Sequence, residues 1–208
     1  MRRAAMKVFQ IPVGPMQNFS YLLEDEKSKE ALAVDSGWET EPIVEVASRE
    51  GMRVKYVCAT HGHFDHVKTI DRLAAELGAT TVAFQGSETR ARLEVVDGIV
   101  LKLGDSEVRV IYTPGHTPDS VCYYDGAHLF TGDTLFIGAW GRTDLPGGSA
   151  SQLYSSLHEI IMRLPGWTVL YTGHDYGEVP FRTLDEESKK NPALRARSVE
   201  EFRRLTQD

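Results

Sequence analysis

The sequence is poor in cysteine and has no long apolar run, and each absence excludes a class of protein. Only two cysteines occur among 208 residues, Cys58 and Cys122. Both fall within predicted strands, so we interpret them as reduced, buried small hydrophobic residues rather than as a disulfide or a metal site. No stretch approaches the length of a membrane span, and no apolar run of signal-peptide length follows the basic residues 1–5. We therefore expect a cytoplasmic protein without a membrane partner.

An excess of positive charge is also missing. The formal net charge is -7 at pH 7, which argues against a surface that binds nucleic acid. No linker, low-complexity segment or tandem repeat divides the chain. With 41% hydrophobic and 25% charged residues, the composition is that of a globular protein that can bury a sizeable core. We expect one domain over residues 1–208 that acts on a small-molecule substrate as a monomer or homodimer.

Apolar and alternating stretches in the first half of the chain predict a mixed α/β protein. A β-hairpin is predicted from residues 7–13 and 19–23. Apolar runs at 31–34 and 54–59 predict further strands, and the second has the continuous apolar character of a buried parallel strand. An amphipathic helix is expected over about 66–77, followed by Gly78 as its stop signal.

The second half of the chain is predicted to be mostly β-structure before one clear helix. Strands are expected over 99–103, 107–112, 120–124, 128–131 and 134–137. A helix is expected over 149–163, where Ser149 and Gln152 have the spacing of a capping box. We expect two β-rich halves, each with helices outside, packed sheet on sheet. Periodicity alone indicates only a mixed α/β fold.

A dense cluster of histidines lies directly after a predicted buried strand. Residues 60–66 have the sequence Thr-His-Gly-His-Phe-Asp-His, which offers His61, His63, Asp65 and His66 as ligands. Neutral imidazole and carboxylate bind zinc, iron and similar ions, and ligands collect at the carboxyl ends of strands in open α/β sheets. In an extended loop His61 and His63 reach one ion, whereas Asp65 and His66 point towards a second. The alternative is a surface loop that is merely rich in histidine.

Three further candidate ligands repeat one local context. His116, Asp133 and His174 each follow a predicted strand, and each has a neighbouring glycine that lets the backbone approach closely. One such residue carries little weight, because an aspartate after glycine is usually part of a turn, but the repetition favours a metal centre. His128 and His158 lack this context, and we assign both to structural roles.

With these residues in place, the chain resembles the metallo-β-lactamase superfamily over nearly its whole length. The matching features are the His-x-His-x-Asp-His motif of residues 61–66 and the downstream His116, Asp133 and His174. The resemblance implies an αββα sandwich, in which two packed mixed β-sheets carry helices on their outer faces and the metals lie at one edge between the sheets. It also implies two divalent ions, with zinc favoured over iron or manganese.

The resemblance divides the ligands between the two ions, with Asp133 as the bridge. The first ion would be held by His61, His63 and His116. The second would be held by Asp65, His66 and His174. Asp65 and Asp133 are therefore the expected catalytic residues, because they hold and orient the hydroxide formed from water between the cations.

Within the superfamily the chain is similar to the glyoxalase II group, through residues 14–18, 133–136 and 141–148. This similarity implies a metal-dependent hydrolase in which hydroxide attacks the carbonyl of a thioester, ester or lactone. Tyr176 is expected to donate a hydrogen bond to the substrate. Arg142 is expected to bind a substrate carboxylate in bidentate fashion, unless it holds Asp144 or Asp175 in a structural pair.

The chain also resembles persulfide dioxygenases, through residues 141–144, 173–176 and 191–194. Those relatives convert glutathione persulfide to sulfite with one iron, held by the residues that match His61, His116 and Asp133. The ligand set does not separate the two activities, so the dioxygenase stands as the alternative to the hydrolase. The acidic charge disfavours a nuclease, and the full ligand set disfavours a non-catalytic binding protein.

Overall fold

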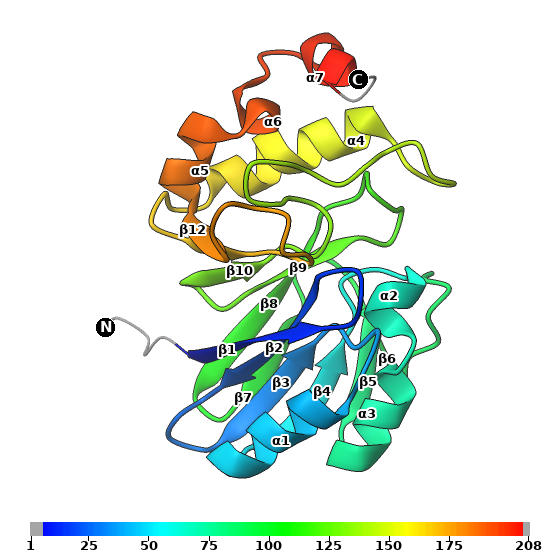
Figure 1. Ribbon diagram of the computed structural model, residues 1–208, viewed down its shortest axis with the longest axis vertical. Coiled ribbons are helices and arrows are strands. Elements are labelled where there is room, and N and C mark those ends of the chain that lie inside the picture. The colour runs from blue at the N-terminus through cyan, green and yellow to red at the C-terminus, as the bar shows by residue number, and fades with distance from the viewer. Residues whose placement is uncertain (1–5, 206–208) are drawn as a thin grey trace.

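The protein consists of two packed β-sheets with helices on both outer faces, as a computed structural model of residues 6–205 shows (Figure 1). The expected αββα sandwich of two mixed sheets is confirmed. Residues 1–5 and 206–208, at the ends of the expected domain, lie outside the described residues. None of the helices within 6–205 has the length and apolar character that crossing a membrane requires.

The first sheet has the strand order β1-β2-β3-β4-β5-β6. Its strands are β1 (Lys7–Val13), β2 (Asn18–Glu24), β3 (Glu30–Val34), β4 (Arg53–Cys58), β5 (Thr80–Phe84) and β6 (Leu93–Val95). The predicted hairpin is confirmed, because β1 pairs antiparallel with β2 and Val13 lies opposite Asn18. Strands β3 to β6 run parallel to one another. The loops that follow β3 and β4 therefore meet at the same edge of the sheet.

The second sheet has the strand order β12-β11-β10-β9-β8-β7. Its strands are β7 (Val100–Leu103), β8 (Ser106–Tyr112), β9 (Val121–Tyr124), β10 (His128–Phe130), β11 (Val169–Tyr171) and β12 (Phe181–Thr183). Strand β9 is antiparallel to both β8 and β10, and β11 is parallel to β10. Strands β8, β10 and β11 thus point in one direction, and the loops after them share one edge.

Helices cover the outer face of each sheet (Figure 1). On the first sheet lie α1 (Glu41–Glu50), the short α2 (Phe64–Val67) and α3 (Ile70–Leu77). On the second lie α4 (Ala150–Ser155), the π-helical η1 (Ser156–Ile160), the 3-10 helix η2 (Ile161–Arg163), α5 (Leu184–Lys190), α6 (Pro192–Arg195) and α7 (Val199–Leu205). Three apolar clusters separate the four layers, with one between the sheets and one beneath each set of helices.

The predicted helix over 66–77 is broken into α2 and α3 at Thr69. The Thr69 amide donates to the Ser36 carbonyl at 2.9 Å instead of to the carbonyl four residues earlier. That carbonyl, on Asp65, accepts from the side-chain amide of Asn18 at 3.2 Å. Contacts to two other segments therefore replace one helical hydrogen bond, and tertiary structure overrides the local helical pattern.

The predicted strand over 134–137 is wrong. A turn over 131–134, in which the Thr134 amide donates to the Thr131 carbonyl at 3.0 Å, leads into a loop whose only β-pairing among the described residues is an isolated bridge between Leu135 and Trp140. Leu135 and Phe136 are apolar because they are buried beside the second sheet, not because they alternate across a pleated strand. A short buried loop thus has the same sequence pattern as a short buried strand.

Candidate metal centre

All seven predicted ligand side chains lie together at one edge of the sandwich, between the two sheets. Four of them belong to the loop after β4 and the start of α2, and three belong to the loops after β8, β10 and β11. Their ligand atoms form three groups in which all atoms lie within 4.8 Å of one another. The groups are His61–His63–His116, His61–His66–Asp133 and Asp65–His66–His174.

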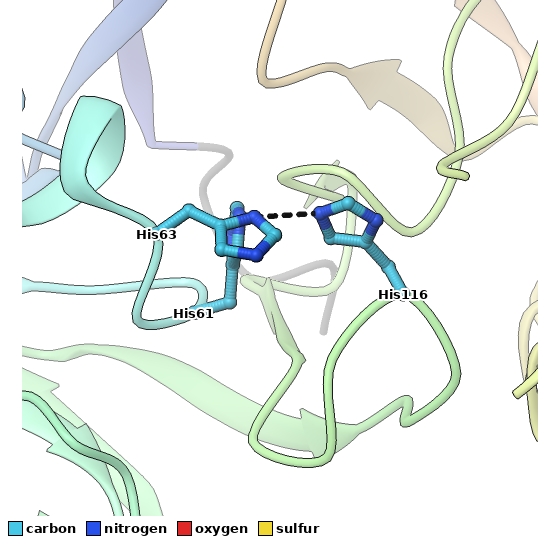
Figure 2. Close-up of side chains that lie close together, drawn as sticks. All are labelled: His61, His63 and His116. Atoms are coloured by element: carbon cyan, nitrogen blue, oxygen red, sulfur yellow. Dashed lines mark hydrogen bonds between the residues drawn. The ribbon is translucent and has the colours of Figure 1, made fainter. Parts of the chain in front are cut away.

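The rings of His61, His63 and His116 converge from opposite sides of the site (Figure 2). His63 Nδ1 lies 3.1 Å from His61 Nε2 and 3.0 Å from His116 Nε2. His61 and His116 are buried, whereas His63 is half-buried. This group is therefore reached from solvent on the His63 side.

Hydrogen bonds fix which ring nitrogens of the first group face inward. His116 Nδ1 donates to the Arg142 carbonyl at 2.8 Å, so its Nε2 carries the lone pair in the neutral ring. Thr60 Oγ1 donates to Asp35 Oδ2 at 2.8 Å and therefore accepts from His61 Nδ1 at 3.0 Å. The Nε2 atoms of both histidines are thus available to a metal ion. In metal sites, a hydrogen-bond partner on the other ring nitrogen commonly fixes the histidine in this way.

The second group of histidines is oriented in the same way. His66 Nδ1 donates to Asp35 Oδ2 at 2.8 Å, and His174 Nδ1 donates to the Met16 carbonyl at 2.9 Å. The two Nε2 atoms consequently point into the site and lie 3.2 Å apart. Four of the five histidines therefore use Nδ1 for an external partner and present Nε2 to the centre.

Asp35 belongs to the site although it was not among the predicted residues. It follows β3, next to the histidine loop, and adopts a φ of 57°. Its carboxylate accepts from the Thr60 amide at 2.7 Å, from Thr60 Oγ1 and from His66 Nδ1. An aspartate at the end of a strand that neighbours the histidine loop is the sequence signal that identifies it, since both loops share one sheet edge.

The carboxylate of Asp133 lies at the centre of the ligand groups. Its Oδ2 is 3.4 Å from His174 Nε2 and 3.6 Å from His116 Nε2, and its Oδ1 is 3.3 Å from His66 Nε2. Oδ1 is buried and has no hydrogen-bond partner of suitable geometry within residues 6–205. A buried acceptor of this kind is costly unless a donor or a cation satisfies it.

Burial favours the neutral form of His61 and of His63. It lowers the pKa of His61 well below its usual value, and the neighbouring His66 lowers that pKa further. Burial also lowers the pKa of His63, to which His116 contributes. Neutral imidazoles retain the lone pairs that a metal ion requires.

In the second group of histidines, His66 and His174, neighbouring carboxylates raise the pKa of each ring. Burial opposes protonation of His66, but Asp133 and Asp35 outweigh it and raise the pKa of His66 to about 9. Burial likewise opposes protonation of His174, whose pKa Asp133 and Asp65 raise to about 10. The buried carboxylates thus require positive charge beside them, which protons or a metal cation can provide. The imidazole and carboxylate donors fit zinc, iron or manganese.

The two predicted substrate-binding residues lie at the exposed side of the site. Arg142 Nε and Nη2 each donate to Asp144 at 2.7 Å, and the two side chains are 63% and 65% exposed. This hydrogen-bonded pairing lowers the pKa of Asp144 to about 2. Tyr176 is 52% exposed, and its ring stacks on His174 with the ring centroids 4.6 Å apart. The structure therefore contains the predicted Arg142–Asp144 pair and places Tyr176 against a candidate ligand.

The fold and the ligand groups define the class of the protein. A sequence model of the metallo-beta-lactamase superfamily matches residues 13–174, and the chain belongs to that superfamily. The human mitochondrial persulfide dioxygenase ETHE1 is 38% identical over 188 residues, which cover 88% of this chain and 74% of that protein. The crystal structure of ETHE1 from Myxococcus xanthus is similar with a TM-score of 0.91 and 32% identity, covering 98% of this chain and 91% of that chain.

A zinc enzyme is also among the relatives. The probable polyketide biosynthesis zinc-dependent hydrolase BaeB from Bacillus velezensis is 30% identical over 191 residues, which cover 89% of this chain and 85% of that protein. Superfamily membership and the grouped His and Asp side chains make this protein a metal-binding enzyme.

The expectation of a glyoxalase II-like hydrolase is wrong. Persulfide dioxygenases at 36% to 38% identity and the ETHE1 structure with a TM-score of 0.91 favour the dioxygenase instead. The physical reason for the error is that the ligand positions are common to both activities, so ligand chemistry does not distinguish them. Zinc was favoured on the same basis, whereas these relatives favour iron.

Proposed function

We propose that the protein is a persulfide dioxygenase that uses one iron ion held by His61, His116 and Asp133. The identity to persulfide dioxygenases over 88% of the chain carries the proposal. Its chemistry also agrees, because two imidazoles and one carboxylate with open positions are the ligand set of non-haem iron oxygenases. All three side chains are buried, and His116 Nε2 lies 3.6 Å from Asp133 Oδ2.

Neighbouring groups of the chain hold these ligands ready for the ion. The Arg142 carbonyl and Thr60 Oγ1 accept the outward N–H of His116 and His61, which leaves both Nε2 atoms directed inward. His174 Nε2 lies 3.4 Å from Asp133 Oδ2 and helps to orient the carboxylate, and His66 Nε2 lies 3.3 Å from Asp133 Oδ1. Preorganised ligands of this kind lower the cost of binding and restrict the geometry of the centre.

The proposed substrate is glutathione persulfide, and iron, when bound, supplies the redox centre for its oxidation. One persulfide, one dioxygen and one water give one thiol, one sulfite and two protons, and dioxygen accepts the four electrons that the outer sulfur loses. Tyr176 is proposed to donate a hydrogen bond to the substrate from the open side of the site. Arg142 is proposed to bind a substrate carboxylate, which then replaces Asp144 as its partner.

The test is elemental analysis of protein purified without added metal, together with oxygen consumption on glutathione persulfide by the same sample. About one iron per chain, with oxygen uptake and sulfite formation, is expected. Iron-loaded protein that takes up no oxygen with the persulfide would contradict the proposal.

Matched alanine variants locate the activity within the site. His61→Ala removes an inward-facing ligand nitrogen and is expected to abolish iron binding and oxygen uptake while the protein stays folded. His158→Ala is the control, because His158 Nε2 donates to the Ala193 carbonyl at 3.0 Å, outside the ligand groups. Equal losses in both variants, or full activity in His61→Ala, would rule out the assigned ligands.

A further inference from the structure

The turn between β1 and β2 crosses from the first sheet to the ligands of the second. The Met16 carbonyl accepts from His174 Nδ1 at 2.9 Å, and the Gln17 carbonyl accepts from the Asp175 amide at 2.7 Å. The Phe19 amide donates to the Gly173 carbonyl at 2.9 Å. The hairpin of β1 and β2 therefore holds the loop that carries His174 through three hydrogen bonds.

Asn18, at the end of this turn, connects the hairpin to the histidine loop. It is only 3% exposed. Its Nδ2 donates to Asp65 Oδ2 at 3.0 Å and to the Asp65 carbonyl at 3.2 Å. Its Oδ1 accepts from Trp38 Nε1 at 2.8 Å. The indole N–H of Trp38 can only donate, so it requires the Oδ1 atom of Asn18. The two Asp65 oxygens can only accept, so they require Nδ2, and both partners therefore fix the same orientation of the amide.

Trp38 is itself held between the turn and the histidine loop. Its ring packs edge-on against Phe64 with centroids 5.9 Å apart, and Lys68 Nζ lies 5.3 Å from the ring centroid. On the other side the ring closely approaches Gly14, where a Cβ atom would lie 2.2 Å from the indole. These contacts hold the ring in the position from which its N–H donates to Asn18.

We propose that Asn18 is a positioning residue of the metal centre and that Trp38 fixes its amide. Asn18 holds Asp65, whose Oδ2 lies 3.4 Å from His174 Nε2. His174 in turn lies 3.4 Å from Asp133, the carboxylate ligand of the proposed iron. The orientation of Asp133 is thus set through a chain that starts at Trp38, outside the ligand groups. The effect on turnover rests on the proposed dioxygenase function, but the effect on metal binding does not.

The inference is tested with cobalt(II) as a spectroscopic probe of the site in three variants. Asn18→Leu keeps the branching and the number of heavy atoms of the side chain and removes its hydrogen bonds. Trp38→Phe keeps an aromatic ring and removes the indole N–H. Trp167→Phe is the matched control, because Trp167 is 61% exposed and lies in the turn before β11. Titrations report the cobalt(II) affinity and the visible absorption bands, and circular dichroism reports folding.

Asn18→Leu is expected to weaken cobalt(II) binding by about tenfold or more and to change its absorption bands, as loss of partners that orient metal ligands does. Trp38→Phe is expected to change the cobalt(II) affinity and the absorption bands in the same direction but by less. Trp167→Phe is expected to leave the affinity and the bands unchanged. If Asn18→Leu does not fold, Trp38→Phe alone decides. Wild-type affinity and bands in folded Trp38→Phe and Asn18→Leu would overturn the inference.

Kinetics separate this inference from the proposed function. If the iron-loaded wild type takes up no oxygen with the persulfide, the proposed function is contradicted. The cobalt(II) titrations still test the positioning role of Asn18 in that case. With an active wild type, iron-loaded Asn18→Leu is expected to lose kcat about tenfold at an unchanged KM, because orientation of the ligand changes while the open side of the site does not. An unchanged kcat in that variant would count against a positioning role.

Discussion

The metal centre depends as much on residues that never touch a metal as on the ligands. Asp35 is the clearest case, because its carboxylate binds both His66 Nδ1 and the Thr60 hydroxyl, which in turn accepts from His61 Nδ1. One side chain therefore sets the ring orientation in two candidate ligands. Carboxylates in this position also raise the basicity of the histidine they hold.

Asp35→Asn is expected to lower metal affinity and activity by about 10- to 100-fold. Asparagine tolerates the left-handed backbone found at this position. Its amide has only one acceptor oxygen, however, whereas both oxygens of Asp35 accept hydrogen bonds from Thr60 or His66. Competition with a chelator measures the affinity, and oxygen uptake measures the activity. Asp105→Asn, at the exposed ion pair with Lys27 in the turn between β7 and β8, is the control and should behave as wild type. Unchanged affinity in Asp35→Asn would remove Asp35 from the site.

The two thiols are expected to be unreactive in the folded protein. Only a thiolate reacts readily with thiol reagents, and burial raises the pKa of Cys122 to about 12 and raises that of Cys58 strongly as well. At pH 8 the native thiolate fraction of Cys122 is about one in ten thousand. A chromogenic thiol reagent should find both cysteines only after denaturation, and rapid labelling of native protein would contradict the burial of the thiols.

The same pKa shifts predict how stability changes in alkaline solution. The unfolded chain releases its thiol protons near pH 9, whereas the folded chain retains them until its raised pKa is reached, so the folded state binds more protons in between. Stability is therefore fully present below about pH 8 and falls as pH rises, by at most about 1.4 kcal/mol per pH unit for each thiol. Urea titrations between pH 8 and 10 measure this slope, and replacing both cysteines with alanine should reduce it.

Single elements were predictable where one physical requirement dominates the pattern. Strand β4 is largely apolar because Val54, Val57 and Cys58 are buried in a parallel sheet. The capping bond from the Gln152 amide to Ser149 Oγ is present at 3.3 Å. The predicted helix over 149–163 begins as expected, but η1 within it is π-helical. There Ser156 Oγ donates to the Pro114 carbonyl beside the His116 turn. A long-range bond of this kind leaves no trace in helical periodicity.

The turn that carries His116 is tightly packed on this helix, which makes Gly115 irreplaceable. Gly115 has a φ of 138°, and a Cβ there would lie 2.2 Å from the Leu153 amide nitrogen. Gly115→Ala is expected to lower the unfolding free energy by more than about 2 kcal/mol and to impair metal binding, since backbone conformation and packing both oppose the methyl group.

Gly126→Ala separates the two causes. Gly126 also has a positive φ, 99°, but a Cβ there meets nothing within 4 Å. Its cost is expected to stay near 1 kcal/mol, from backbone conformation alone, with metal binding intact. Urea unfolding and metal titration of both variants provide the comparison. An equal loss of unfolding free energy in Gly115→Ala and Gly126→Ala would mean that Leu153 moves to accommodate the added methyl group.

For the whole molecule, the ligand positions were more predictable than the arrangement of the layers. Each predicted ligand lies shortly after a strand, which is a local signal, and the structure brings all seven side chains together. Which sheet faces pack together depends on contacts between residues far apart in sequence, and periodicity alone indicated only a mixed α/β fold. The role of Asn18 was not predictable for the same reason, because its partners Trp38 and Asp65 are brought to it by folding.

Because the ligands come from both sheets, a bound ion connects the two halves of the sandwich. Metal removal is therefore expected to lower the unfolding temperature. At a free metal concentration 100 times the Kd, binding stabilises the folded state by about 2.7 kcal/mol. For a chain of this size that corresponds to roughly 5–11 °C. Scanning calorimetry before and after chelation measures the shift, and His61→Ala should show none. An equal chelator effect in that variant would place the ion elsewhere.

The separation of the ligands along the chain also has a consequence during biosynthesis. The first, His61, lies in the early part of the sequence, and the last, His174, is near its end. At a translation rate of about 5–20 residues per second, roughly 6–23 s pass between their synthesis. The histidine loop is thus exposed to the cell's metal pool well before Asp133 and His174 exist. The full set of candidate ligands exists only after residues 61–174 have been synthesised and have folded together, so we expect the metal to be loaded late.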